Sequence, residues 1–382
     1  MTRFVGPGST IGILGAGQLG RMLAISARQM GYRIAVFGGD RGSPAGQVSD
    51  LAWTGEFDDE DKLLEFARAC DVVTYEFENI PSHAAAAIEE HAPLCPGVKL
   101  LQTAQNRFAE KTALSSIGLR TAGFRMVSSS DELATARADF GGSVILKANT
   151  DGYDGKGQWS VTSTDDVESL WSEADLKEGI VEERIDFEFE LSIVAGRFAD
   201  GTAVFYDPLL NHHAHHILDV SVSAAPQVTE SVTNEAVEMA RAVLEHFDVV
   251  GVLCIELFLT NDGHLVVNEI APRPHNSGHL TIEAYHCSQF ELQLRTICGL
   301  PSVPLVRRAP AAAMANLLGQ HMPHAWTGDS LSALKSPSIS LHLYGKPESR
   351  SNRKMGHITA TGDDPLAVER AVRVFREALL QP

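Results

Sequence analysis

The stretch from 251 to 279 constrains the fold most, because two apolar runs of β type flank a turn sequence. The runs cover 252–259 and 265–270, and 261–264 between them reads NDGH. Asp-Gly between apolar runs predicts a tight hairpin, since such a turn needs positive φ at its centre. A turn centred on Asp262 and Gly263 places Glu256 directly opposite Glu269 on one face of the sheet.

Two opposed carboxylates in an apolar setting repel each other, and a divalent cation between them removes that cost. Carboxylate oxygens suit Mg²⁺, so the hairpin predicts a magnesium site. The alternatives are an exposed face on which both acids are solvated, or a bulge that shifts the register. Past the second strand, Arg273, His275 and Asn276 stand among prolines and small residues that restrict the backbone, which indicates a site for an anionic substrate.

Charge and cysteine usage exclude several classes of protein. At a net charge of −18, general binding to nucleic acids or anionic membranes is not expected. The 382 residues allow two or three domains. The five cysteines lack CxxC spacing, which is typical of a reduced, cytoplasmic protein. We expect no signal peptide and no membrane span, since no apolar run is long enough.

The N-terminal segment predicts a βαβ unit. A strand at 10–14 leads through the glycine turn GAGQLG at 15–20 into a helix at 21–30 and a strand at 32–37. With Asp40 as a ribose-binding acid, the GxGxxG pattern predicts a dinucleotide site, or more broadly a phosphate on the helix N-terminus. A third strand at 72–77 ends near Glu78, at the edge where such sheets bind ligands, although Glu78 could equally be a solvated loop acid.

A smaller α/β unit is expected at 120–190, after a helix at 106–118. A strand at 144–147 ends in Lys147, and the following loop, DGYDGKGQ at 151–158, has three glycines and a lysine. Glycines let the backbone close over phosphates and lysines supply charge, so the segment predicts a nucleotide clamp rather than an ordinary hairpin loop. Glu182 and Glu190 could accept hydrogen bonds from adenine and ribose, or be surface acids.

The remainder of the chain holds a histidine run and a basic loop. The run NHHAHH at 211–216 lacks zinc-site spacing, and one histidine touching a ligand fits better than zinc. We expect helices at 229–247, 281–298 and 364–380, and strands at 311–318 and 338–344. Four basic residues in the loop 345–357 predict an anion site, with a solvated hairpin tip as the alternative: Lys346, Arg350, Arg353 and Lys354.

Together these segments resemble the ATP-grasp ligases, and among them the 5-(carboxyamino)imidazole ribonucleotide synthases of purine biosynthesis. The resemblance spans nearly the whole chain in family order and rests on GILGAGQLGRML, YEFENIP, GYDGKGQ, IVEE, NHHAHHIL, VVNEIAPRPHNSGH and NRKMGHIT. It implies an α/β ATP-grasp fold with three domains. These are an N-terminal Rossmann-like (pre-ATP-grasp) domain at 1–104, an ATP-grasp domain at 105–302 with a lid at about 120–190 and a central subdomain at about 191–302, and a small β-rich C-terminal domain at 303–382.

The resemblance also implies a reaction, the ATP-dependent carboxylation of 5-aminoimidazole ribonucleotide with bicarbonate through carboxyphosphate. ATP and Mg²⁺ would be the cofactors, with Mg²⁺ on Glu256 and Glu269, and the protein would be a homodimer. The residues implied for ATP are Arg107, Lys147, Gly152, Tyr153, Asp154, Gly155, Lys156, Gly157, Gln158, Glu182, Glu183, Arg184, Ile185, Glu190, His213, Asn268 and Glu269. Those implied for the ribonucleotide and carboxyphosphate are Gly17, Gln18, Leu19, Glu78, Tyr153, Asp154, Arg273, His275, Asn276, Ser277, Lys346 and Arg353. Those implied to be catalytic are Asp154, Arg273, His275 and Lys346.

Two positions depart from the family pattern, and three other functions stay open. His216 stands where glycine is usual, and Ser351-Asn352 where Pro-Gly is usual. The alternatives are another ATP-grasp amine ligase that uses glycine or formate, an NAD(P)-dependent oxidoreductase built on the N-terminal unit, and a non-catalytic nucleotide-binding regulator. The crowded polar set after Ile270 argues against the regulator.

Overall fold

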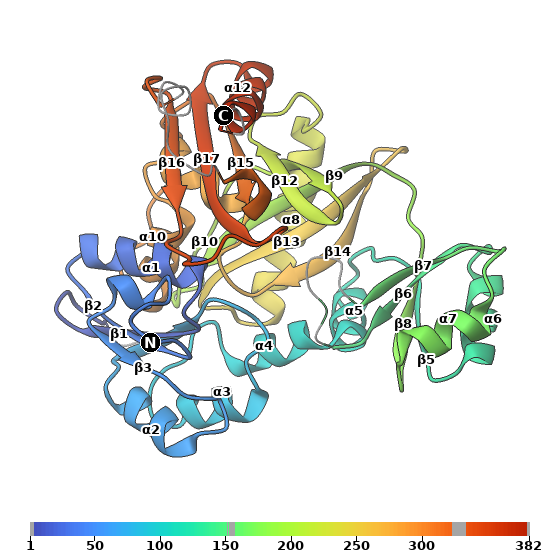
Figure 1. Ribbon diagram of the computed structural model, residues 1–382, viewed down its shortest axis with the longest axis horizontal. Coiled ribbons are helices and arrows are strands. Elements are labelled where there is room, and N and C mark those ends of the chain that lie inside the picture. The colour runs from blue at the N-terminus through green and yellow to red at the C-terminus, as the bar shows by residue number, and fades with distance from the viewer. Residues whose placement is uncertain (1–3, 151, 153–156, 323–333, 380–382) are drawn as a thin grey trace.

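The structure is a computed structural model that describes residues 4–150, 152, 157–322 and 334–379. Its strands form three sheets. Figure 1 shows an N-terminal unit, a large central unit, and a lid that projects to one side of the central unit. Among the described residues, no helix has both the length and the apolarity that a membrane span requires.

The N-terminal unit is a parallel sheet with strand order β3-β2-β1-β4. Its strands are β1 (Thr10–Leu14), β2 (Arg33–Phe37), β3 (Leu51–Trp53) and β4 (Val72–Tyr75), and its helices are α1 (Gln18–Gln29), η1 (Gly46–Val48), α2 (Glu60–Arg68), α3 (Ser82–Glu89) and α4 (Val98–Gln105). Ile11 and Ile13 pack on one face with α1, whereas Leu14 packs on the other with α2 and α3. Because helices cover both faces, these strands are mostly apolar, as the sequence predicts.

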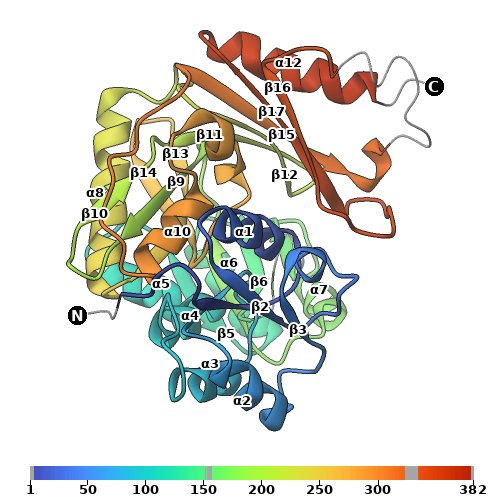
Figure 2. The same ribbon diagram turned by 90° about the vertical axis from the view of Figure 1, so that its left-hand side faces the viewer.

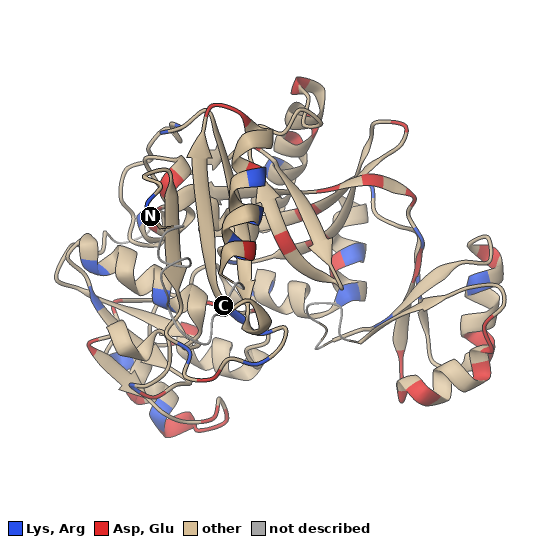
Figure 3. Ribbon diagram, turned by 45° about the horizontal axis from the view of Figure 1, so that its top comes forward, with Lys and Arg blue, Asp and Glu red and all other residues tan. Residues whose placement is uncertain are grey.

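The lid is a separate antiparallel sheet with its own core. Its order is β5-β8-β6-β7. Its strands are β5 (Phe124–Val127), β6 (Val144–Ala148), β7 (Gln158–Val161) and β8 (Gly179–Glu183), and its helices are α6 (Ser130–Asp139) and α7 (Val167–Ala174), with α5 (Arg107–Ser116) leading in. Leu133, Leu146 and Val181 belong to a core made only of lid residues. Figure 3 shows acidic positions, coloured red on the ribbon, along the lid helices.

The central sheet has nine strands and includes the C-terminal segment. The path is β14-β13-β9-β11-β12-β15-β17-β16, with β10 on β9. The strands are β9 (Phe187–Arg197), β10 (Ala203–Phe205), β11 (Leu209–Ala214), β12 (Ile217–Val222), β13 (Gly251–Thr260), β14 (Leu265–Ala271), β15 (Ala311–Leu318), β16 (Ile339–Leu343) and β17 (Lys354–Gly362). The helices are α8 (Glu230–His246), η2 (Ser277–Leu280), α9 (Thr281–Ala284), α10 (Gln289–Ile297), η3 (Gly319–His321) and α12 (Pro365–Ala378).

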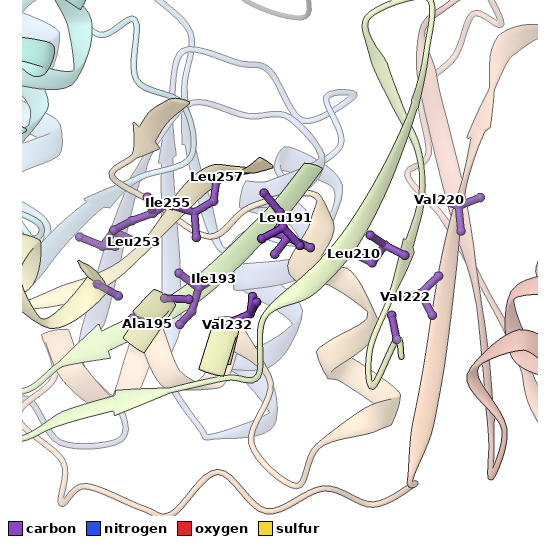
Figure 4. Packing of buried hydrophobic residues seen from close by; sticks show 14 of the residues in the cluster. Leu191, Ile193, Ala195, Leu210, Val220, Val222, Val232, Leu253, Ile255 and Leu257 are labelled. Carbon is purple, nitrogen blue, oxygen red and sulfur yellow. The ribbon is translucent and has the colours of Figure 1, made fainter. Parts of the chain in front are cut away.

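One hydrophobic core crosses the boundary that we expected near residue 303. It joins Leu191 and Ile255 of the central strands to Val222 of β12, and to Ala315 and Val372 of the C-terminal segment. Figure 4 shows its central part, and Figure 2 shows β15–β17 standing beside β12 with α12 across them. The C-terminal segment is therefore an extension of the central sheet.

The hairpin of β13 and β14 pairs as predicted, but through a different turn. The Thr260 N–H donates to the His264 carbonyl at 2.9 Å, so the loop has three residues, and Gly263 has φ +82°. The predicted two-residue turn is wrong. A bulge at Asn268 then shifts the register back, and Glu256 pairs with Glu269. The predicted pair is confirmed because the longer loop and the bulge offset each other.

The single helix expected at 281–298 is wrong, because the chain forms α9 and α10 with a break between them. Tyr285 is extended, pairs with Arg307 and donates its hydroxyl to Asp207. Ser288 then caps α10 by accepting from the Glu291 N–H. These tertiary contacts outweigh the helical spacing of apolar residues in the sequence. That spacing continues across the break because α9 and α10 both pack against the central sheet.

Candidate active site

A cavity of about 920 Å³ lies where the N-terminal unit, the lid and the central sheet meet. Most of the predicted site residues line it. They are Gln18, Leu19, Glu78, Arg107, Lys147, Gly152, Gln158, Glu182, Glu183, Arg184, Ile185, Glu190, His213, Glu256, Asn268, Glu269, Arg273, His275 and Asn276. The structure thus brings together side chains that are up to 258 positions apart, from Gln18 to Asn276.

Some predicted residues are placed elsewhere. Gly17, Gly157, Ser277, Lys346 and Arg353 are not among the residues that line the cavity. Tyr153, Asp154, Gly155 and Lys156 lie outside the described residues. Other residues that line it were not assigned from the sequence, among them Glu76, Gln105, Glu110, Asn149, His279 and Lys354.

The glycine turn holds a carboxylate of the chain itself. Both oxygens of Glu76 accept backbone hydrogen bonds at the start of α1, one from Gly17 and one from Gly20 at 2.6 Å. A Cβ on Gly15 or Gly17 would lie within 2.6 Å of the Glu76 side chain. The glycines therefore admit Glu76, whose carboxylate takes the position at which a dinucleotide fold holds a phosphate. This argues against the dinucleotide interpretation and against a phosphate on these N–H groups.

The lid side of the cavity contains a buried charge cluster. The Lys147 ammonium lies 2.8 Å from the Glu182 carboxylate, and the Lys111 ammonium lies 3.4 Å from the same oxygen. Burial raises the pKa of Glu182, but the two lysines lower it more, so the carboxylate stays charged. The start of helix α5 could have indicated Lys111, because a lysine one turn into a helix that also contributes Arg107 can reach the same site.

The paired acids at the hairpin each have a cation beside them. Glu269 lies 3.1 Å from Arg107, and Glu256 lies 3.1 Å from His275. Burial raises the pKa of Glu256, but His275 lowers it further, to about 2. Glu256 is therefore ready to bind a cation without first losing a proton.

The donor set fits Mg²⁺. The bulge places Asn268 beside Glu269 on the cavity side, where strict alternation would have turned it away. Among the described residues, no three or more His, Cys, Asp or Glu side chains are arranged so that they alone could hold a metal ion. A site with two carboxylates suits Mg²⁺, which commonly takes its other ligands from water and substrate phosphates.

Helix α5 holds the bulge in place from the side. Glu110 accepts from the Ile270 N–H at 2.6 Å, and Lys111 donates to the Asn268 carbonyl at 2.8 Å. Burial, with the nearby charge of Glu269, raises the pKa of Glu110 to about 8. β14 is an edge strand, and these two side chains form hydrogen bonds with backbone N–H and C=O groups that no further strand pairs with.

The segment after β14 is anchored on two sides. Arg273 forms an ion pair with Glu78 of the N-terminal unit. The His275 Nδ1 lies 2.9 Å from the Ser277 hydroxyl, and the Ser192 hydroxyl donates to Ser277 at 2.8 Å. The side-chain amide of Asn211 in turn donates to Ser192. Burial lowers the pKa of His275, but Cys254 and Glu256 raise it more, to about 10. Asn211, the first residue of the histidine run, is thus connected to His275 through two buried serine hydroxyls.

The histidines at 212–216 have separate roles in the structure. The His213 Nδ1 lies 2.9 Å from Glu190, and both residues line the cavity. His212 faces Glu369 of α12 at 3.4 Å. His216 has φ +63°, as does Asn352, which explains why glycine suits both positions in the family pattern.

The basic loop turns one of its lysines to the cavity. Lys354, at the start of β17, lines the cavity, whereas the Arg353 guanidinium donates to the Glu348 carbonyl at 3.0 Å. Lys346 donates to the Lys354 carbonyl at 2.7 Å, and Arg350 pairs with Glu348. The predicted anion contact therefore has a candidate in Lys354, which the sequence did not distinguish from its neighbours.

A lid sheet facing a central sheet across a cavity with buried lysines and two paired acids defines the ATP-grasp class of enzyme. Comparison with protein-family models agrees. Residues 9–105 match the ribonucleotide synthetase preATP-grasp domain, 112–290 the ATP-grasp domain, and 312–371 the phosphoribosylaminoimidazole carboxylase C-terminal domain.

Curated relatives narrow the class to one family. The N5-carboxyaminoimidazole ribonucleotide synthase of Bacillus subtilis is 39% identical over 353 residues, covering 92% of this chain and 91% of the relative. That of Brucella melitensis is 40% identical over 356 residues, covering 92% and 96%. The chain belongs to the N5-carboxyaminoimidazole ribonucleotide synthase family. It also matches the bifunctional purine synthesis protein purC/E of Dictyostelium discoideum at 39% identity, where it covers 37% of that protein's length.

Solved structures agree over nearly the whole chain. An ADP complex of an N5-carboxyaminoimidazole ribonucleotide synthetase has a TM-score of 0.92 at 39% identity and covers 98% of both chains. A synthase from Aspergillus clavatus in complex with ADP and 5-aminoimidazole ribonucleotide has a TM-score of 0.88 at 30% identity, covering 97% and 98%. The α/β ATP-grasp fold and the ligase class expected from the sequence are confirmed.

Proposed function

We propose that this protein carboxylates 5-aminoimidazole ribonucleotide at the expense of ATP, with bicarbonate as the carbon source. The products are 5-carboxyaminoimidazole ribonucleotide, ADP and phosphate. The observation that carries the proposal is the continuous cavity, which joins the lid to the N-terminal unit and has Glu256 and Glu269 on its wall. A nucleotide and a second anionic substrate can therefore meet in one enclosed space.

The nucleotide is proposed to bind between the lid and the central sheet. Lys147 would contact its phosphates, and the backbone of 182–185 would lie along the base. Glu190 and His213, already in contact with each other, would hold the ribose side. The loop residues Gly152 to Gln158 would cover the phosphates, although four of them lie outside the described residues.

Mg²⁺ is proposed to bind Glu256 and Glu269, with Asn268 beside them. When bound, it would neutralise charge on the phosphoryl group that is transferred. Arg107 and His275, which face the two carboxylates, would hold them in position for the metal.

The ribonucleotide is proposed to bind on the side of the N-terminal unit. Gln18, Leu19 and Glu78 line that side, and Arg273, His275 and Asn276 face them from the end of β14. Arg273 is fixed by Glu78 and supplies a permanent positive charge in a buried setting, where it acts strongly on a phosphoryl or carboxylate group.

The chemistry then follows in two steps. A bicarbonate oxygen attacks the γ-phosphorus of ATP, the bond to the β,γ-bridging oxygen breaks, and carboxyphosphate and ADP form. The exocyclic amine of the ribonucleotide attacks the carboxyl carbon, phosphate leaves, and the amine loses a proton. Enclosure protects the labile carboxyphosphate from water. Arg273 and Lys147 stabilise the negative charge that accumulates on the transferred group.

A turnover assay tests the reaction. Purified protein with ATP and Mg²⁺ should release ADP rapidly only when both bicarbonate and 5-aminoimidazole ribonucleotide are present. ADP release driven by glycine or formate instead would assign another amine ligase, and quenching of nicotinamide fluorescence on titration would favour the oxidoreductase.

The basic loop offers a paired test of the phosphate contact. Replacing the basic residue that holds the ribonucleotide phosphate should weaken its binding by about 1.5–3 kcal/mol, roughly tenfold to over a hundredfold. Lys354→Ala is expected to do so, because Lys354 lines the cavity. Titration of ribonucleotide for Lys354→Ala and Arg353→Ala compares the two, and a larger effect of Arg353→Ala would restore Arg353 as the contact. Neither should alter ADP binding.

The resemblance to the family further supports a homodimer in the cytoplasm. Sedimentation at micromolar concentration would test the dimer, and fractionation of cells would test the location.

A further inference from the structure

Gln289, the first residue of α10, is completely buried and lies behind the cavity wall. It does not line the cavity, but it reaches the segment between β14 and α9, which carries four residues that do, and it contacts two of them, His275 and His279.

The amide of Gln289 directs its hydrogen bonds to that segment, using both N–H groups and one acceptor position of its oxygen. Its oxygen accepts from the His275 N–H at 2.9 Å, and its nitrogen donates to the His275 carbonyl at 2.7 Å. The same nitrogen lies 3.2 Å from the Nδ1 of His279. An amide nitrogen can only donate, so His279 Nδ1 accepts, and a neutral ring then carries its proton on Nε2.

The surroundings leave the Gln289 side chain no other position. A Cβ on Gly278 would lie 2.5 Å from its oxygen, so the segment has closed onto the amide. The Gln289 N–H also donates to the Thr281 hydroxyl at 3.0 Å. Burial, together with the charge of His275, lowers the pKa of His279 well below its usual value, which agrees with a neutral ring that accepts a hydrogen bond.

We propose that Gln289 is a positioning residue for the carboxylation reaction. It pairs with both peptide groups of His275, as a neighbouring strand would, and thereby fixes where that imidazole meets the cavity. It also fixes the His279 ring in the tautomer with its proton on Nε2. The proposal rests on the proposed function, because the reaction supplies the assay.

Gln293 provides a matched control for Gln289. It lies one turn further along α10, is equally buried, and also makes hydrogen bonds with both ends of its amide. It accepts from the Val252 N–H at 2.6 Å and donates to the Thr74 hydroxyl at 2.8 Å. These partners do not line the cavity.

The kinetic test compares Gln289→Leu with Gln293→Leu. Both substitutions should lower the free energy of unfolding, since each leaves buried polar groups unpaired. Only Gln289→Leu should lower kcat, by about tenfold or more, because small displacements of reacting groups are costly. The Kd for ADP should stay within about twofold in both. Equal losses of kcat in the two variants would overturn the proposal.

A spectroscopic test does not depend on turnover. In ¹⁵N spectra of the histidine-labelled protein, His279 should show a protonated Nε2 and an unprotonated Nδ1. Gln289→Glu keeps the volume and the acceptor for the His275 N–H, and at a pH at which the new carboxyl group is ionised it cannot donate, so the proton should move to Nδ1 of His279. Protonation of Nδ1 in the unsubstituted protein would refute the proposal. A protein that fails to turn over the ribonucleotide would instead contradict the proposed function and leave this measurement intact.

Discussion

At the scale of single residues, Glu76 shows how one side chain redirects a familiar motif. A glycine turn at the start of a helix normally offers its N–H groups to a ligand phosphate. Here Gly17 and Gly20 donate to the two oxygens of Glu76 instead. The motif therefore supports a carboxylate on the cavity wall, and the ligand contacts proposed for Gln18 and Leu19 would be made by their side chains.

Glu76→Gln should destabilise the N-terminal unit. Two N–H donors face two oxygens, and an amide would turn an NH₂ group toward one of them, leaving a buried donor unsatisfied. We expect a loss of about 1–3 kcal/mol in the free energy of unfolding. Urea denaturation measures it, with Glu65→Gln on the exposed side of α2 as the control. A loss as small as that of the control would show that Glu76 does not hold the turn.

Glu269→Gln separates metal binding from stability. The sequence alone predicts that removing one of two opposed charges relieves repulsion. In the structure Arg107 already offsets Glu269, and the pair is partly exposed, so without metal we expect a change of less than about 1 kcal/mol. The additional thermal stabilisation by ADP when Mg²⁺ is added should disappear. Melting curves with ADP, recorded with and without Mg²⁺, measure this effect. Glu188→Gln, an exposed substitution on the same sheet, is the control. A Mg²⁺ effect that survives would place the metal elsewhere.

At the scale of elements, α12 is fastened to the sheet by one acid. Asp219 of β12 lies 3.1 Å from Arg373 and also pairs with Arg376. Burial raises the pKa of Asp219, but the hydrogen bonds and charges of the two arginines lower it more, to below its ordinary 3.8. The folded pKa is lower than the unfolded one, so this carboxylate stabilises the fold above about pH 3.8 and loses that effect as the pH falls further.

Asp219→Asn should therefore cost stability at neutral pH and less in acid. We expect a loss of about 1–3 kcal/mol at pH 7, because two half-buried guanidinium groups lose a charged partner and only Arg373 keeps a second one, Glu369. The difference from the unsubstituted protein should shrink below about pH 3.8. Denaturation from pH 7 to pH 3 measures it, with the exposed Asp363→Asn as the control. A difference that does not depend on pH would mean that packing, not charge, fastens the helix.

At the scale of the whole molecule, the cavity wall comes from units with separate cores. Lys147 and Glu182 belong to the lid, whose core is its own, and Asn268 and Glu269 belong to the central sheet. A ligand that contacts both stabilises their mutual arrangement, since it binds only when both are in place. Nucleotide binding should accordingly link the lid to the rest of the molecule.

Hydrogen exchange should reveal this link. With ADP and Mg²⁺, amides of β6 and β8 should exchange more slowly than in the free protein. Peptides from α2 and α3, which cover the far face of the N-terminal sheet, serve as the internal control and should not change. Equal slowing in both regions would indicate general stabilisation rather than a ligand held between lid and sheet.

The sequence predicted most of this architecture wherever local periodicity and pairing decide the outcome. Buried strands such as β1 and β15 begin and end where their apolar runs do. The Glu256–Glu269 pair was right although the turn was wrong, because the three-residue loop and the bulge at Asn268 offset each other. An alternation with a period of two predicts neither feature. The break at Tyr285 and the partner of Gly17 depend on residues far along the chain, which no local pattern contains. For the same reason Lys354 could not be told from Arg353.

The order in which the strands of the central sheet are synthesised also determines how long the growing chain can pair with other chains and aggregate. β12 pairs with β15, so Val220 meets Ala315 across the sheet. A ribosome makes the first of these long before the second. Until then the growing chain exposes the edge of β12, with unpaired N–H and C=O groups that other nascent chains can join. Every truncated chain that ends between those strands keeps this open edge. The full-length chain covers the edge of β12 only when β15 has paired with it.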